Sequence, residues 1–217
     1  MIALAIDAST YRGTVAVIRE GSIAATAEAA MRGTTSDGLM PAVAAALASA
    51  GVDRASVDRV ICGAGPGSFT SLRIAAGIAK GIALGASAPL YAVSSLGLML
   101  AASSAPPGTY VVTLDALRDE WYAAVFDRLD NGTVTERQPV VLVAKEHLAD
   151  LVASVVGASV LGAAAGGAAP HASGCVALAE SIERSGPVDL DRWEPAYGRL
   201  AEAQVKWEAA HGRSLGA

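Results

Sequence analysis

Tyr110-Val111-Val112-Thr113-Leu114-Asp115 is a short, mostly apolar run that ends in an aspartate. It repeats the opening of the chain, Ile2-Ala3-Leu4-Ala5-Ile6-Asp7. A run of this length and composition is typical of a buried strand. When Asp7 is aligned with Asp115, the segments that follow also correspond, so the sequence predicts two related halves.

Each half continues as a loop, a second strand, a tight turn and a third strand. The turns are Glu20-Gly21 and Asp130-Asn131-Gly132, and residues of this kind favour hairpins. The predicted strands are Thr14–Arg19 and Ser22–Ala29 in the first half, and Trp121–Arg128 and Thr133–Val143 in the second. An internal repeat constrains the whole topology. We therefore predict an α/β fold of two ribonuclease H-like lobes, of the actin/Hsp70/sugar-kinase type.

The run Pro106-Pro107-Gly108 predicts the boundary between a lobe at residues 1–105 and a smaller lobe at residues 106–217. Further elements of the first lobe are expected as helices Ser36–Ala50, Ser68–Leu84 and Ser94–Ala102 and strands Val57–Ala64 and Pro89–Val93. The second lobe has room for less, with a strand at Ala158–Ala165 and helices at Cys175–Arg184 and Leu200–Ala210.

Composition limits the classes of function. Of 217 residues, 53% are hydrophobic and 17% are charged, which indicates a folded chain. The formal net charge of −5, without a basic stripe, predicts that any contact with nucleic acid is made through a partner.

The sequence also points to the cytoplasm. The uncharged stretches Gly81–Leu114 and Leu151–Ala179 are both interrupted by glycine and proline, so neither predicts a membrane span. The opening residues do not resemble a signal peptide. Cys62 and Cys175 form no CxxC motif and are expected to be reduced. We expect a soluble, cytoplasmic protein.

Candidate nucleotide contacts lie where the first strand of each half ends. In the actin-like fold such loops cradle phosphate, and an aspartate lies near the metal. Asp7, Ser9, Thr10 and Asp115 are the corresponding residues, but neither loop contains glycine. The aspartates could equally cap their own loops. The histidines, His147, His171 and His211, have no metal-ligand spacing, so we predict no metal site and no catalytic residue.

Gly77, Gly81 and Gly85 form a stripe along the helix that follows Gly65-Pro66-Gly67-Ser68. Each glycine inside a helix costs about 1 kcal/mol relative to alanine, so close packing is expected to offset them. The neighbour could be the protein's own sheet or a second chain. Nine candidate partner-binding residues follow from this helix and the preceding one: Leu39, Met40, Val43, Arg73, Ile74, Gly77, Ile78, Gly81 and Gly85.

Several motifs resemble those of the TsaB (YeaZ) family, and they occur in the family's order along the chain. Ala64-Gly65-Pro66-Gly67-Ser68-Phe69-Thr70-Ser71-Leu72-Arg73-Ile74 is similar to its G-P-G-S-F-T-G-[LV]-R-I signature. Ile6–Thr10 resembles I-D-T-S-T, Asp115–Tyr122 resembles D-A-R-x-x-E-[VW]-Y, and Glu194–Arg199 resembles E-P-x-Y-x-R. Gly77–Gly85 is similar to the family's glycine-rich helix.

The resemblance implies a non-catalytic partner of the TsaD transferase. With the TsaE ATPase, these proteins move a threonylcarbamoyl group from its AMP adduct onto adenosine 37 of tRNAs that read ANN codons. It also implies that TsaD binds helices of the first lobe and that the protein pairs with itself through the same surface when alone. We expect no cofactor, and the sequence leaves open whether ATP or ADP binds at the partner interface.

Ser71 and Leu117 depart from the family pattern, as does the segment around Thr35, which lacks a metal-binding histidine. The departures at Ser71 and Leu117 put a nucleotide contact in the second loop in doubt, and the missing histidine weakens any metal role. Two other classes remain as alternatives: a small actin-like-fold ATPase or kinase acting through Asp7 and Asp115, and a glycoprotease-type peptidase, for which metal ligands are missing.

Overall fold

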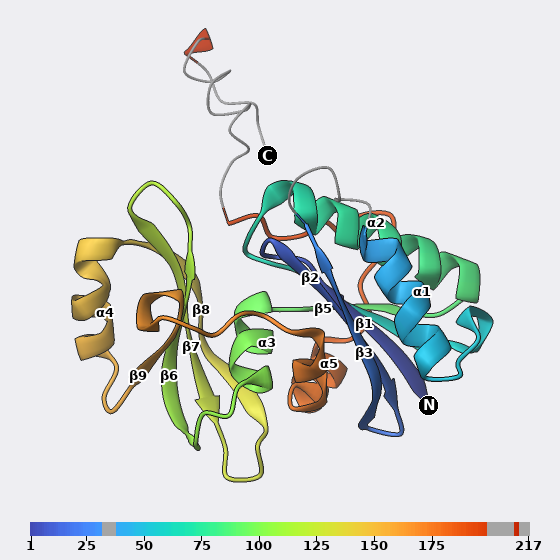
Figure 1. Ribbon diagram of the computed structural model, residues 1–217. Helices are drawn as coiled ribbons and strands as arrows, with labels where there is room; N and C mark the ends of the chain where they lie inside the picture. The colour runs from blue at the N-terminus through green and yellow to red at the C-terminus, as the bar shows by residue number, and fades with distance from the viewer. Residues whose placement is uncertain (32–37, 199–210, 213–217) are drawn as a thin grey trace.

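The computed structural model describes residues 1–31, 38–198 and 211–212, and these residues form two β-sheets (Figure 1). The first sheet has the strand order β3-β2-β1-β4-β5, and the second has the order β8-β7-β6-β9. In each sheet the first three strands are antiparallel neighbours, and the next strand pairs in parallel with the first. The second sheet therefore repeats the first with one parallel strand fewer, which confirms the prediction of two ribonuclease H-like lobes.

The strands of the first sheet begin and end close to the predicted positions. They are β1 (Ile2–Asp7), β2 (Arg12–Arg19), β3 (Ser22–Ala30), β4 (Arg59–Gly63) and β5 (Leu90–Val93). The second sheet contains β6 (Gly108–Asp115), β7 (Glu120–Arg128), β8 (Val134–Ala144) and β9 (Ser159–Gly162). Glu20 and Gly21 both adopt positive φ, as a two-residue hairpin turn requires.

The helices form three layers around the two sheets (Figure 1). Helices α1 (Leu39–Ser49) and α2 (Phe69–Ala86) cover the outer face of the first sheet. Helix α4 (Leu148–Ser154) covers the outer face of the second. Between the sheets lie α3 (Ser95–Ala102), the 3-10 helix η5 (Ala172–Val176) and α5 (Ala179–Ser185).

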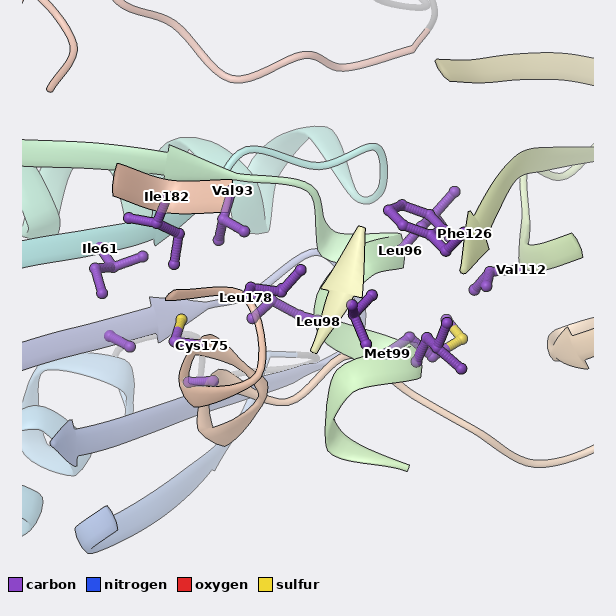
Figure 2. Close-up of a cluster of buried hydrophobic side chains, with 14 of the residues drawn as sticks. Ile61, Val93, Leu96, Leu98, Met99, Val112, Phe126, Cys175, Leu178 and Ile182 are labelled. Carbon is purple, nitrogen blue, oxygen red and sulfur yellow. The ribbon is translucent and has the colours of Figure 1, made fainter. Parts of the chain in front are cut away.

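Alternation along the strands places this chain's apolar residues in separate layers. Leu4 and Ile6 of β1 face the outer helices, whereas Ala3 and Ala5 face the space between the sheets. The small alanines leave room for the middle layer, in which Leu96, Leu98 and Met99 of α3 belong to the same buried cluster as Phe126 of the second sheet (Figure 2). One apolar core thus joins the two lobes.

Some predicted elements differ from the structure. The strand predicted at Ala158–Ala165 is only β9, because Gly162 has a positive φ and the chain turns there into the 3-10 helix η4 (Ala163–Ala165). The single helix predicted at Cys175–Arg184 is wrong, since η5 and α5 are separate. Helix α4 was not predicted. The helix predicted at Ser36–Ala50 begins inside residues 32–37, which lie outside the described residues, and the structure has α1 beginning at Leu39 with Gly38 as its N-cap. The helix predicted at Leu200–Ala210 also lies outside the described residues.

The chain returns to the first lobe after β9. Residues 187–198, which we name the C-terminal strap, run along the edge of the first sheet and over α2 (Figure 1). Val188 N donates to Leu90 O at 2.8 Å, and Ala196 N donates to Ala64 O at 2.7 Å. The division into residues 1–105 and 106–217 stays a prediction, because the chain from Ala172 onward packs on both sheets.

Helix α2 is, among the described residues, the one helix long and apolar enough to cross a membrane by length and composition. Its buried side chains, such as Leu72, Ala75 and Ile82, pack on the first sheet. A core helix of a globular protein meets the same criterion, so this signal for a membrane span is weak.

Candidate functional site

Asp7 is a fully buried carboxylate at the end of β1, on the side of the sheet that faces the second lobe. Its Oδ1 accepts hydrogen bonds from Ser9 N at 3.0 Å and from Ser9 Oγ at 2.8 Å. Its Oδ2 accepts a bond of 2.5 Å from Ser95 Oγ, and Ser95 Oγ in turn accepts one from Gly65 N at 3.1 Å. Asp7 therefore ties together the first loop, the turn before α2 and the start of α3.

Two glycines let the backbone close around this carboxylate. A Cβ on Gly63 would lie 1.9 Å from Asp7 Oδ2, and a Cβ on Gly67 would lie 2.0 Å from Ser9 O. Ser68 N donates to Ser9 O at 2.7 Å, so the beginning of α2 is hydrogen-bonded to the loop after β1. Ser68 holds the N-cap position of α2, but its side chain makes no capping bond. The backbone of Gly67 and Ser68 therefore lies directly against Ser9 O of the first loop.

Burial raises the pKa of the Asp7 carboxyl above its usual range, although the hydrogen bonds from Ser95 and Ser9 act in the opposite direction. Ser9 is also buried. Thr10 Oγ1 donates to Arg12 O and accepts from Arg12 N, so it stabilises its own loop. Of the two readings of the first loop, the geometry favours the loop cap over the phosphate contact.

Asp115 occupies the equivalent place in the second lobe, but its side chain is exposed. Its Oδ1 accepts from Leu117 N at 2.9 Å, just as Asp7 accepts from Ser9 N, so both strand ends form the same two-residue aspartate turn. Lys145 Nζ lies 3.5 Å from Asp115 Oδ1 and 4.6 Å from the centre of the Trp121 ring. The repeat seen in the sequence thus extends to hydrogen bonds of the loops.

A cleft of about 450 Å³ lies between the lobes. It is lined by the Gly65-Pro66 turn, the end of β5, Tyr122, the strap and part of β8. Among the described residues that line the cleft, Glu136 is the only charged one. A nucleotide phosphate would meet no lysine or arginine there, so neither the cleft nor the loop at Asp7 fits a phosphate group.

The described part of the chain contains no group of three or more His, Cys, Asp or Glu residues that could hold a metal ion. His171, one of the histidines considered from the sequence, is instead the N-cap residue of η5. Its Nδ1 accepts a hydrogen bond from Ser173 N at 3.1 Å.

The predicted partner-binding residues of α1 divide into two groups. Leu39 and Val43 have no exposed surface and belong to the core between α1 and the first sheet, so the prediction that they contact a partner is wrong. Met40 is 41% exposed and remains a candidate. A periodic apolar stripe shows that a helix has a buried face, but it does not show whether that face packs on the helix's own sheet or on another chain.

The predicted glycines of α2 face away from the sheet. Gly77, Gly81 and Gly85 are all exposed, and a Cβ built on any of them would meet nothing within 4 Å among its described neighbours. The alternative in which the stripe packs on the protein's own sheet is therefore wrong. Ile74 and Ile78 lie beside the stripe and are half-buried. The result is an exposed helix face without side chains, which another backbone can approach closely.

Arg73 stands at the N-terminal end of this face and forms a cluster that the sequence did not predict. Its guanidinium lies 4.3 Å from the centre of the Phe69 ring, and its Nε donates to Tyr197 Oη at 3.2 Å. The Phe69 and Tyr197 rings are 4.4 Å apart. We call these three residues the Arg73 clamp. Phe69 and Tyr197 each belong to a family motif, but they are far apart in sequence, so only the fold brings them together.

Comparisons with known proteins place the chain in one group. A family model described as TsaD, tRNA N6-adenosine threonylcarbamoyltransferase, matches residues 31–157. The tRNA threonylcarbamoyladenosine biosynthesis protein TsaB of Escherichia coli (strain K12) is 36% identical over 131 residues, which are 59% of this chain and 56% of that protein. The matched region thus spans about half the length of that relative.

Two further comparisons cover nearly the whole chain. The protein of the same name from Bacillus subtilis (strain 168) is 30% identical over 226 residues, 95% of this chain and 98% of the relative. A solved structure from Pseudomonas aeruginosa, described as an uncharacterized protein with similarity to peptidase YEAZ, superposes with a TM-score of 0.76 at 26% identity. It covers 91% of this chain and 99% of that one.

Proposed function

This chain belongs to the TsaB (YeaZ) family, and we propose that it is the partner subunit that activates TsaD for N6-threonylcarbamoylation of adenosine 37 in tRNAs reading ANN codons. TsaE is the third protein of the proposed complex. The chain itself has a net charge of −5, so tRNA is contacted through the complex and not by this subunit alone.

The observation that carries this proposal is the exposed glycine face of α2. Gly77, Gly81 and Gly85 cost helix stability, and nothing among the described residues packs on them. A helix of TsaD packing along this face would offset that cost, since small residues allow close approach of two helices. We propose that Met40 and Arg73 border the same contact and that two copies of the chain pair through it when TsaD is absent.

The proposed role is not catalytic. Asp7, the best candidate for a nucleotide-binding carboxylate, is enclosed by Ser9, Ser95 and the backbone of Gly63. This arrangement disfavours the alternative of a small ATPase or kinase, because Mg-nucleotide would have to displace three hydrogen bonds to reach the carboxylate. Any ATP or ADP in the complex would then be held mainly by the partner's residues at the interface. The cytoplasm, where tRNA is modified, is the proposed location.

A reconstitution tests the proposal. Threonylcarbamoyl transfer from its AMP adduct to tRNA is measured with the same organism's TsaD and TsaE, with and without this protein, and this protein is also assayed alone. We expect transfer only when all three proteins are present and no turnover by this chain alone. Transfer that is equally fast without the chain would refute the partner role.

ATP hydrolysis by the isolated chain, lost in an Asp7→Ala variant, would instead support the ATPase alternative. Thermal unfolding of Asp7→Ala in parallel is needed for this arm, because the buried hydrogen bonds of Asp7 also stabilise the fold.

A further inference from the structure

The Arg73 clamp joins three parts of the molecule. Phe69 and Arg73 come from the first two turns of α2, and Tyr197 comes from the C-terminal strap. Tyr122 Oη of the second lobe donates to Tyr197 O at 3.1 Å. Along the helix, Lys80 Nζ lies 5.8 Å from the centre of the Trp193 ring, so the strap meets α2 at two places. The strap therefore belongs to the same surface as the exposed side of α2.

Among the residues that the structure describes, the clamp engages only one side of the Arg73 guanidinium. Its Nε is bonded to Tyr197, and its planar group stacks on Phe69. No ion pair joins Arg73 to a carboxylate within residues 1–31, 38–198 and 211–212, and the side chain is exposed. A guanidinium fixed in this way presents two terminal nitrogens in one plane, which match the two oxygens of a carboxylate.

The electrostatic surroundings also favour an anion. The first turn of α2 contains no acidic residue, so no side chain there offsets the positive end of the helix dipole. A carboxylate bound here would meet both the positive charge of Arg73 and this end of the helix dipole. Stacking on Phe69 and Tyr197 limits the rotamer freedom that Arg73 would otherwise lose on binding.

We propose that Arg73 is the carboxylate-recognising residue of the partner surface, that Tyr197 is its positioning residue, and that the partner presents an Asp or Glu side chain at this point. The inference rests on the proposed function, since TsaD is the partner. It adds the C-terminal strap to the surface and gives the chemistry of one contact.

The test compares binding of TsaD to the full chain carrying single substitutions. Arg73→Gln removes the charge, Arg73→Lys keeps the charge without the planar group, and Tyr197→Phe removes only the hydroxyl. Arg192→Gln is the matched control, because it removes the same charge from a strap side chain that is 90% exposed and outside the clamp. Dissociation constants are measured at low and high salt, and thermal unfolding shows whether each variant is folded.

We expect Arg73→Gln to weaken binding about ten- to hundredfold, as for a lost charge-assisted hydrogen bond, and to reduce its salt dependence. Arg73→Lys should fall between the wild type and Arg73→Gln. Tyr197→Phe should weaken binding about two- to tenfold with the salt dependence retained, and Arg192→Gln should bind within about twofold of the wild type. Loss of a merely structural contact would lower the unfolding temperature without changing the salt dependence.

Binding of Arg73→Gln that matches Arg192→Gln would overturn the inference and leave the proposed function intact. If the wild type itself fails to bind TsaD, the proposed function is refuted, and this inference with it.

Discussion

Ser95 Oγ donates a hydrogen bond of 2.5 Å to Asp7 Oδ2, so the first residue of the helix between the lobes closes over the aspartate that ends the first strand. Gly63, next to Asp7 on the neighbouring strand, has no Cβ that would block this contact. In this chain the position where an actin-like ATPase would expose a carboxylate to nucleotide is instead a buried link between structural elements.

The stability of the protein should fall as pH rises because of Asp7. Its folded-state pKa is raised above the ordinary value of 3.8, so between these two values the native state binds more protons than the unfolded state. The free energy of unfolding therefore loses a contribution as pH rises through this interval. Chemical denaturation between pH 4 and 8 should show that the wild type loses stability relative to Asp7→Asn. Asp130→Asn, in an exposed turn, controls for the change in net charge.

A difference between wild type and Asp7→Asn that stays constant with pH would contradict this assignment. Asn can keep the bonds from Ser9 through its oxygen and place its amide against Ser95, so the variant is expected to fold.

Two glycine substitutions should have opposite effects on stability. Gly63→Ala places a Cβ on the Asp7 carboxylate and should cost about 1–3 kcal/mol or more, because backbone or Asp7 must shift. Gly77→Ala meets open space on α2 and should stabilise the protein by up to about 1 kcal/mol through helix propensity. Denaturant titration of both variants measures the difference, and equal effects would show that the close approach at Gly63 is not constraining.

Gly81→Leu should abolish pairing while the monomer stays folded. A Cβ at position 81 would meet nothing within 4 Å inside the described chain, but a leucine side chain would force another backbone away from α2. Light scattering and binding to TsaD report the loss, and Gly81→Ala should show a smaller one. Normal pairing by Gly81→Leu would remove this face from the interface.

Cys62 and Cys175 should be unreactive in the native protein. Both thiols are buried, and desolvation raises the pKa of each far above its usual value. A chromogenic disulfide reagent should therefore react only after denaturant is added. An Ala48→Cys variant, which adds a thiol at an exposed position of α1, is the positive control. Rapid labelling of the native wild type would mean that the core around Cys62, between the first sheet and the outer helices, or the middle layer around Cys175 opens.

The sequence by itself determined the local elements and the repeat. Strand alternation, hairpin glycines and strand-ending aspartates depend on neighbouring residues, so both three-strand meanders could be predicted together with most of the first lobe. It also identified the α2 glycine stripe. Its motifs indicated the family, because ordered motifs are carried by residue identity alone.

Only the tertiary structure decided which faces are buried and which distant residues meet. Leu39 and Val43 face the sheet while Gly77 faces outward, and helical spacing is the same in both cases. Tyr197 reaches Arg73 only because the chain returns from the second lobe to the first. The physical reason is that burial and long-range contacts depend on how whole elements pack. The local sequence pattern does not specify which element each face will pack against.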